Sequence, residues 1–221
     1  GGICVDNASN YWFSTLGEGV FFLNSSLIKS YKLVESDLAR KVYSFAFDSK
    51  GDIYVGYEKG IVEKYHEGER VLSSNLSTMN LRSNVVKKIL IHKNDEPVYV
   101  LENQVVFPEP EKNKKYPFKI GAIKDAELLS NDKLVLVSRG FVLKESDSGF
   151  DTIRYTNRYT TCSSGSSKLF YFSSIDSLFR FENNKIVSDA RHIVAEHGRI
   201  VDLCFANDNS LWVCTYNNGV R

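Results

Sequence analysis

Residues 45–62 read FAFDSKGDIYVGYEKGIV, and this stretch contains the pattern that decides the fold. A short apolar segment, 45–47, leads into a polar turn at 48–52, and an apolar segment with a central tyrosine follows at 53–56. A glycine-containing turn and a third apolar segment complete the block. Short apolar and aromatic runs separated by Gly, Asn, Asp and Ser are typical of antiparallel strands joined by tight turns.

The same block recurs along the chain. Clear copies occupy 3–23 and 203–220, and three weaker copies lie between them. One residue of each copy is taken as its centre: Trp12, Tyr54, Tyr99, Val135, Phe170 and Trp212. Consecutive centres are 42, 45, 36, 35 and 42 residues apart, with a mean of 40. A repeat of about 40 residues with several strands is the signature of a β-propeller, in which stacked blades bury each other's faces.

A fourth apolar segment follows the block in five of the six copies. These segments are Leu27–Leu33, Arg70–Leu72, Tyr116–Ile120, Asp151–Tyr155 and Lys185–Val187. We therefore predict an all-β fold, a β-propeller of four-stranded antiparallel blades with five complete blades and one partial blade. The expected blades span residues 1–34, 42–78, 85–120, 121–156, 158–190 and 199–221.

The sixth copy ends before a fourth strand, which leaves two arrangements open. The chain forms either a six-bladed ring or a fragment of a larger, seven-bladed one, and we favour the fragment. The unpaired edge of the partial blade would then promote association with a second copy, such as a dimer.

Composition excludes several classes of protein. Hydrophobic residues make up 43% and charged residues 25% of the 221 residues, which is ordinary for a folded domain and excludes a disordered chain. The net charge of +1 lacks the basic excess that a nucleic-acid-binding surface needs. Apolar runs reach only about five residues, too few to cross a membrane.

Cysteine and histidine spacing predicts neither a metal site nor a catalytic centre. The four cysteines and four histidines lack zinc-ligand spacing, and no Gly-x-Ser-x-Gly motif is present. We therefore assign no metal, no cofactor and no catalytic residue. Cys4, Cys162 and Cys204 each fall eight residues before a centre, and we interpret them as buried thiols that act as small apolar side chains.

Two further groups of residues receive structural interpretations. Trp12, Tyr54 and Trp212 occupy equivalent strand positions and are expected to pack between blades. Asp6 and Asp48 precede tight turns, where a carboxylate caps a turn amide, and we prefer this role to calcium binding.

Candidate ligand-binding residues come from the loops on one face of the propeller. This face collects the loops between second and third strands and the segments that lead into first strands. The candidates are Glu18, Tyr57, Glu58, Lys59, Arg139, Arg199, Tyr216 and Asn217. Tyrosine together with arginine, asparagine and glutamate suits a small polar ligand that contains a ring.

The three clear copies resemble the repeat of two-component-regulator propellers. The matching residues are Asp6, Asn10, Trp12, Ser14, Thr15, Gly19 and Val20 in the first copy, Asp48, Gly51, Tyr54, Gly56, Gly60 and Ile61 in the second, and Leu211, Trp212, Thr215, Gly219 and Val220 in the last. Tyr54 replaces the tryptophan of the pattern, and Ala206 stands at its aspartate position.

The resemblance implies an extracytoplasmic, periplasmic sensor region of a Bacteroidetes-type histidine kinase or hybrid two-component regulator. In that family the propeller catalyses nothing, receives a ligand such as a glycan, and belongs to a membrane-anchored protein whose kinase module lies elsewhere. Two alternatives stay open: an extracellular protein-interaction propeller, and a propeller lyase or hydrolase.

Overall fold

The computed structural model resolves the chain into two compact units, Gly1–Asp37 and Leu38–Arg221, which are described separately. The described residues are 3–8, 10–14, 20–24, 41–76, 84–108, 114–118, 122–129, 131–154, 163–165, 170–174, 177–182, 185–188, 199–206, 210–216 and 219–220.

The first unit contains one antiparallel sheet of three strands. Its strands are β1 (Ile3–Val5), β2 (Tyr11–Ser14) and β3 (Val20–Leu23), paired in sequence order. We call this sheet blade 1. The predicted fourth strand, Leu27–Leu33, lies outside the described residues.

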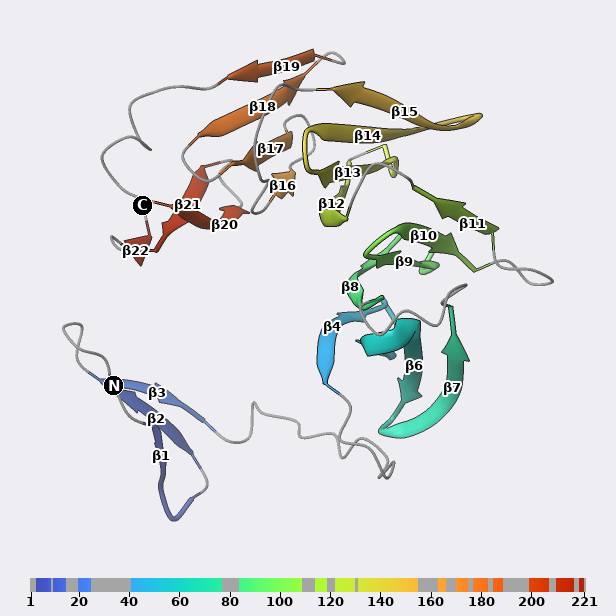
Figure 1. Ribbon diagram of the computed structural model, residues 1–221. Helices are drawn as coiled ribbons and strands as arrows, with labels where there is room; N and C mark the ends of the chain where they lie inside the picture. The colour runs from blue at the N-terminus through green and yellow to red at the C-terminus, as the bar shows by residue number, and fades with distance from the viewer. Residues whose placement is uncertain are drawn as a thin grey trace. The chain divides into compact units, whose positions relative to one another are not determined.

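The second unit contains four four-stranded sheets and one three-stranded sheet, all antiparallel and each paired in sequence order (Figure 1). Blade 2 comprises β4 (Val42–Phe47), β5 (Ile53–Tyr57), β6 (Ile61–His66) and β7 (Glu69–Asn75). Blade 3 comprises β8 (Val86–Ile91), β9 (Pro97–Leu101), β10 (Gln104–Phe107) and β11 (Lys114–Pro117). Blade 4 comprises β12 (Ile123–Leu128), β13 (Leu134–Ser138), β14 (Phe141–Ser146) and β15 (Gly149–Arg154).

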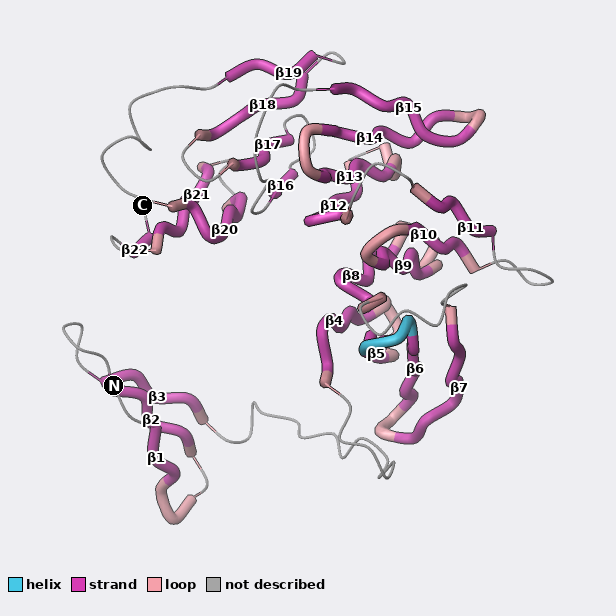
Figure 2. The backbone as a smooth tube through the Cα atoms, in the orientation of Figure 1, coloured by secondary structure: helices cyan, strands magenta, loops and turns pink. Residues whose placement is uncertain are grey.

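Blade 5 comprises β16 (Ser163–Gly165), β17 (Phe170–Ser173), β18 (Leu178–Glu182) and β19 (Lys185–Ser188). Blade 6 comprises β20 (Ile200–Phe205), β21 (Leu211–Thr215) and β22 (Gly219–Val220). In Figure 2 the described residues form strands joined by loops and turns, with one helical turn, η2 (Glu58–Gly60), between β5 and β6. The all-β propeller fold predicted from the repeat is confirmed.

The first strands of successive blades lie side by side. β4 contacts β8, β8 contacts β12, β12 contacts β16, and β16 contacts β20 (Figure 1). Such stacking places the first strand of every blade toward the inside of a propeller.

Alternate residues of each second strand pack against opposite neighbouring blades. In β13, Leu134 and Leu136 join a buried cluster with blade 3, whereas Val135 and Val137 join one with blade 5. Successive side chains of a strand point to opposite faces, so a blade packed on both faces needs an uninterrupted apolar second strand. This requirement explains the run Leu134–Ser138, which is buried throughout.

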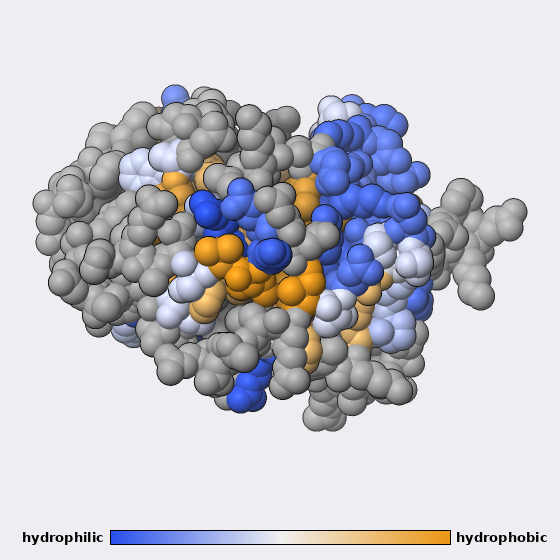
Figure 3. Space-filling view, turned by 90° about the horizontal axis from the view of Figure 1, so that it is seen from above, coloured by the Kyte–Doolittle hydropathy of each residue, from blue (hydrophilic) through white to orange (hydrophobic). Residues whose placement is uncertain are grey.

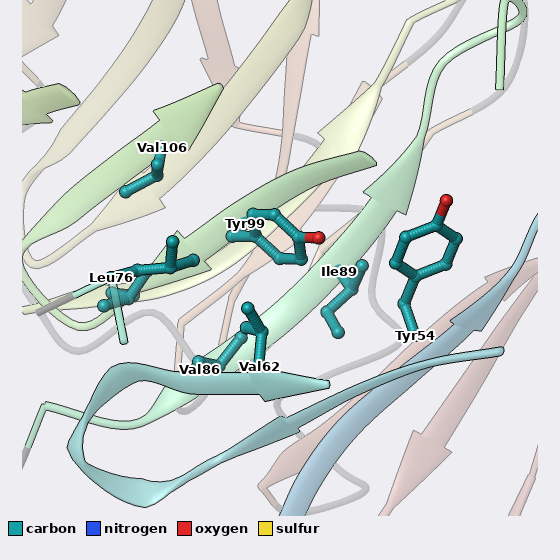
Figure 4. Close-up of a cluster of buried hydrophobic side chains, with 8 residues drawn as sticks. Tyr54, Val62, Leu76, Val86, Ile89, Tyr99 and Val106 are labelled. Atoms are coloured by element: carbon teal, nitrogen blue, oxygen red, sulfur yellow. The ribbon is translucent and has the colours of Figure 1, made fainter. Parts of the chain in front are cut away.

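The seam between blades 2 and 3 has the same construction. Tyr54 and Val62 of blade 2 meet Val86, Ile89 and Tyr99 of blade 3 in one buried cluster (Figure 4). The predicted packing of Tyr54 between blades is therefore confirmed.

The pairing corrects two of the proposed repeat centres. Tyr54 and Val135 face the following blade, but Tyr99 and Phe170 face the preceding one. Their neighbours Val98 and Tyr171 are the true equivalents, because each joins the cluster with the following blade. A shift of one residue moves a side chain to the other face of the sheet, so the two aromatic residues marked the wrong face.

Trp212 and Cys204 also differ from expectation. They pair across β20 and β21, as Tyr54 pairs with Ala46, but Trp212 is 50% exposed and Cys204 is exposed. In both strands the adjacent residues, Leu203 and Val213, form the face that packs against blade 5. The predictions of an interblade tryptophan and a buried thiol at these positions were therefore wrong for the described structure; the side chains of Trp12, Cys4 and Cys162 lie outside its described part.

The aspartate turns form as predicted. Asp6 Oδ1 accepts hydrogen bonds from the amides of Ala8 and Asn10, both at 2.9 Å. Asp48 Oδ1 accepts them from Lys50 at 3.0 Å and from Asp52 at 2.9 Å. Both carboxylates thus cap the turn between a first and a second strand, which is the interpretation we preferred to calcium binding.

Candidate functional site

The two ends of the blades carry different kinds of connection. At one end the first strands begin and the second strands run into the third; we call this the loop end. At the other end, the turn end, the first strands run into the second through turns such as 48–52 and 92–96. Every predicted ligand-binding residue that the structure describes belongs to the loop end, and Glu18 and Asn217 lie outside the described residues.

Tyr57 contributes its side chain to the interior of blade 2. It is 2% exposed, and its hydroxyl donates to Glu63 Oε2 at 2.9 Å. Tyr65 donates to the same oxygen at 2.7 Å, and Arg70 donates to Glu63 Oε1 at 3.1 Å. Burial raises the pKa of Glu63, but these three donors outweigh it and hold the pKa below its usual value. In this conformation the Tyr57 side chain packs inside blade 2, and its hydroxyl is not exposed at the loop end.

Four other candidates are exposed at the loop end. Lys59 lies in the helical turn after β5 with a left-handed backbone (φ 60°), and Arg139 lies between β13 and β14. Arg199 and Tyr216 are neighbours, because the amide of Tyr216 donates to the carbonyl of Arg199 at 2.9 Å. Tyr216 is 78% exposed, so its ring is available for stacking. Glu58, next to Lys59, is partly exposed.

A β-bulge recurs at the same place in four first strands. The register shifts between Val42 and Ser44, Val86 and Lys88, Ile123 and Asp125, and Ile200 and Asp202. Each shift leaves one extra residue, namely Tyr43, Lys87, Lys124 or Val201, at the start of the strand. Bulges re-aim side chains and are frequent beside binding sites. In each of these four strands, the repeat therefore places one additional residue at the loop end.

Three of the four residues that follow the bulges are charged, and one of them, Lys88, links two neighbouring blades. Lys88 donates to Asp125 Oδ1 at 3.0 Å and to Glu127 Oε1 at 2.7 Å, which joins β8 to β12. Burial lowers the pKa of Lys88, but the two carboxylates outweigh it and raise the pKa above its usual value. Burial also raises the pKa of Glu127, and the charges of Asp125 and Asp202 add to that rise.

The bulge residues of blades 3 and 4 form a second charged group. Lys87 Nζ lies 3.8 Å from Glu102 Oε1, and the carbonyl of Glu102 accepts the amide of Ile123 at 2.7 Å. This bond attaches the β9–β10 loop to the start of β12, beside Lys124. Sequence patterns did not single out Lys87, Glu102 or Lys124, since a bulge is marked by one additional residue and not by any residue type.

The turn end carries a separate ionic cluster in blade 2. Asp52 accepts from Lys64 Nζ at 2.6 Å and contacts His66 Nδ1 at 2.5 Å. The hydrogen bond from Lys64, followed by that from His66, lowers the pKa of Asp52, and the bond to Asp52 raises the pKa of His66. Tyr54 lies beneath Lys64, whose ammonium is 5.0 Å from the ring centre. This cluster joins the turn before β5 and β5 itself to β6, and it stabilises one blade internally.

Metal-ligating groups were also sought among the described residues. Among them, no three His, Cys, Asp or Glu side chains are arranged to hold a metal ion. The exposed loop-end groups are cationic, aromatic and carboxylate side chains suited to hydrogen bonding and stacking with a polar ligand.

Comparison with known proteins identifies the fold and no closer relationship. No family model matches the chain, and no curated protein matches it. Among solved structures, a streptogramin B lyase matches 99% of this chain and 76% of its own, with a TM-score of 0.68 and 13% identity. The extracellular domain of a hybrid two component system from B. thetaiotaomicron matches 96% of this chain at a TM-score of 0.58 and 16% identity.

A third similar structure is PorZ, a surface component of the type-IX secretion system of Porphyromonas gingivalis, with a TM-score of 0.64 and 15% identity. This chain corresponds to 38% of PorZ and to 31% of the two-component protein's chain. The chain is a β-propeller. At these identities the likeness establishes the fold alone, and an extracellular domain of a two component system, a lyase and a secretion component share it.

Proposed function

We propose that this chain is a non-catalytic, ligand-binding propeller in the extracytoplasmic sensor region of a bacterial two-component receptor. The observation that carries the proposal is the position of Lys59, Arg139, Arg199 and Tyr216, which come from three blades and are exposed at the same end. Loops of different blades that converge on one end of a rigid scaffold are the usual means by which such scaffolds bind ligands.

The fold likeness to an extracellular sensor domain supports this assignment. No helix in the described part of the chain is both long and apolar enough to span a bilayer. A periplasmic position and a kinase module elsewhere in the protein are part of the proposal.

A glycan is the ligand class that the exposed residues suit. Tyr216 offers a ring on which a sugar can stack, and the adjacent Arg199 offers several donors for hydroxyl groups. Titration of the protein with a panel of oligosaccharides, followed by thermal unfolding, tests this. Binding raises Tm, and Tyr216→Ala reduces the rise without changing the Tm of the free protein. A panel without any Tm shift contradicts the proposal.

An extracellular protein-interaction role is the second candidate, favoured by the likeness to PorZ, a bacterial surface component. Under that role a protein partner, and no oligosaccharide, would be bound by the loop end. A stable complex in a pull-down, together with an unresponsive oligosaccharide panel, would select it.

A lyase or hydrolase is the third candidate, favoured by the likeness to streptogramin B lyase. Such an activity needs an acid or base that converges with a cation at the loop end. Turnover of polysaccharides or lactones that is abolished by Tyr216→Phe would select it over the sensor.

A further inference from the structure

Consecutive blades need contacts that fix the rotation of one blade against the next. Apolar packing fills the seams, and apolar side chains also reach the face shown in Figure 3, beside hydrophilic ones. Apolar contacts are non-directional, so they hold two blades together but define the angle between them only weakly. Hydrogen bonds have a preferred geometry, and polar contacts between blades can therefore set that angle.

The turns between first and second strands are built alike in blades 2, 3 and 4. They span residues 48–52, 92–96 and 129–133. In each turn the first amide donates to the fifth carbonyl, and the fourth amide donates to the first carbonyl. The fourth residue has a left-handed backbone in all three, with φ 83° at Gly51, 65° at Asp95 and 64° at Asp132. Glycine adopts this conformation without strain and aspartate does not, so an aspartate in two of the turns points to a role for its side chain.

The Asp95 carboxylate reaches the preceding blade. Its Oδ1 accepts a hydrogen bond from the amide of Ser49 at 2.9 Å, and its Oδ2 accepts one from the Ser49 hydroxyl. Ser49 is the second residue of the turn in blade 2, so both oxygens of one carboxylate bind a single residue of the neighbouring turn. The two hydrogen bonds from Ser49 lower the pKa of Asp95. Asp95 thus joins the turn ends of blades 2 and 3.

Asp132 makes the equivalent contact one blade further along. Both of its carboxylate oxygens lie 3.4 Å from the amide nitrogen of Lys93, the second residue of the turn in blade 3. Its Oδ2 also lies 3.0 Å from His92 Nδ1. At both seams, therefore, the fourth residue of one turn contacts the second residue of the preceding turn. Gly51, at the same position in blade 2, has no side chain that could make such a contact.

The same two seams are also tied at the loop end. Between blades 2 and 3, Ser44 Oγ donates to the carbonyl of Val86 at 2.7 Å. Between blades 3 and 4, the amide of Ile123 donates to the carbonyl of Glu102 at 2.7 Å. A contact at one end alone would let a blade rotate about it, whereas contacts at both ends fix the angle of the seam.

We infer that Asp95 and Asp132 act as interblade clasps, each of which fixes the turn end of its own blade against the turn of the blade before it. This role is conformational and does not depend on the ligand that the loop end binds. Without a clasp, the seam is still held at the loop end and by apolar packing, so the turn end can open locally while the strands stay folded. The amide that each aspartate accepts reports on its clasp, because loss of the bond exposes that amide to exchange.

Hydrogen exchange of single amides, followed by NMR, tests the inference. Asp95→Gly removes the clasp and relieves the left-handed backbone at once, and it should speed exchange of the Ser49 amide about tenfold and lower Tm by about 3 °C. Asp95→Asn keeps an acceptor and tolerates the left-handed backbone, so it should keep most of the protection. Asp132→Gly should speed exchange at Lys93 and leave Ser49 unchanged, with a smaller effect because its hydrogen bonds are longer.

Glu67→Gly is the matched control. Glu67 has a left-handed backbone (φ 48°) in the turn between β6 and β7, and its side chain is exposed. This substitution relieves the same kind of backbone strain without removing a contact between blades, so Tm should change little. Unchanged exchange of Ser49 in Asp95→Gly, or of Lys93 in Asp132→Gly, overturns the inference. A Tm loss in Glu67→Gly as large as that in Asp95→Gly overturns it as well.

Discussion

Lys88 on β8 donates to Glu127 on β12 at 2.7 Å, so an ion pair joins the first strands of two consecutive blades. The same ammonium holds Asp125 at 3.0 Å. All three side chains are largely shielded from water, and removal of the cation would leave two neighbouring carboxylates of β12 without their partner.

Lys88→Met should therefore destabilise the protein by about 2 kcal/mol at neutral pH, less than for a fully buried pair because water still reaches these groups. Urea unfolding measures the change. Lys133→Met, which breaks the exposed pair with Asp147, is the control and should leave the unfolding midpoint unaltered. Equal effects of the two substitutions would contradict a special role for the seam.

Gly56 is required by the contact between blades 2 and 3. A Cβ atom at this position would lie 2.5 Å from Ser44 Oγ and 2.6 Å from Val86 Cγ1. Gly56→Ala should cost about 3 kcal/mol through overpacking. Gly51→Ala is the comparison, because it meets no atom within 4 Å and is strained only through its φ of +83°. We expect Gly51→Ala to lower the free energy of unfolding by about 1 kcal/mol. A larger loss for Gly51→Ala than for Gly56→Ala would refute the packing explanation.

The buried carboxylate of Glu63 stabilises blade 2 through three donors, Tyr57, Tyr65 and Arg70. Glu63→Gln keeps the shape but removes the charge, and should lower the free energy of unfolding at pH 7 by about 2 kcal/mol. Because the pKa of Glu63 lies below its usual 4.5, this contribution is present above that pH and disappears as the pH falls through the lowered pKa. Urea unfolding of both proteins across the acidic range checks the amount and its pH dependence.

The contact between His66 and Asp52 predicts a different pH dependence. The raised pKa of His66 means that its charge stabilises the fold fully below the ordinary 6.5, and that this contribution is lost as the pH rises through the raised value. Because the pKa of Asp52 is lowered, Asp52 stays ionised until the pH falls below 3.8, the usual pKa of an aspartate. His66→Gln should thus lower Tm at about pH 5 and have little effect at about pH 9. The same Tm loss at both pH values would show that the ion pair is not the cause.

The repeat allowed much of the fold to be predicted. The eight-residue offset between Ala46 and Tyr54, and between Cys204 and Trp212, turned out to be a direct cross-strand pair in each case. Turn residues and apolar alternation specify such pairs locally, so the pairs can be predicted from the sequence of a single blade. The face that a residue occupies is harder to assign, since Tyr99 and Val98 are both apolar and only tertiary packing separates them.

The candidate site was predicted less completely. Loop positions follow from the strand order, so Lys59, Arg139, Arg199 and Tyr216 lie at the end where the sequence placed them, and their role in ligand binding stays a prediction. Burial of a loop-end side chain depends on its partners, and Tyr57 turned inward because Glu63 lies across the strand pair to accept its hydroxyl. Lys87 and Lys124 were missed because the bulges that present them depend on register, and the four bulge residues share no chemistry.

Hydrogen–deuterium exchange with and without tetragalacturonate tests most directly the claim that the loop end binds the ligand. We predict slower exchange at 57–60, 102–103, 139–140 and 199–200, and unchanged exchange in the turns at 49–51, 93–96 and 131–133. Protection confined to the turn end, or absent from both ends at saturating probe, would contradict the account.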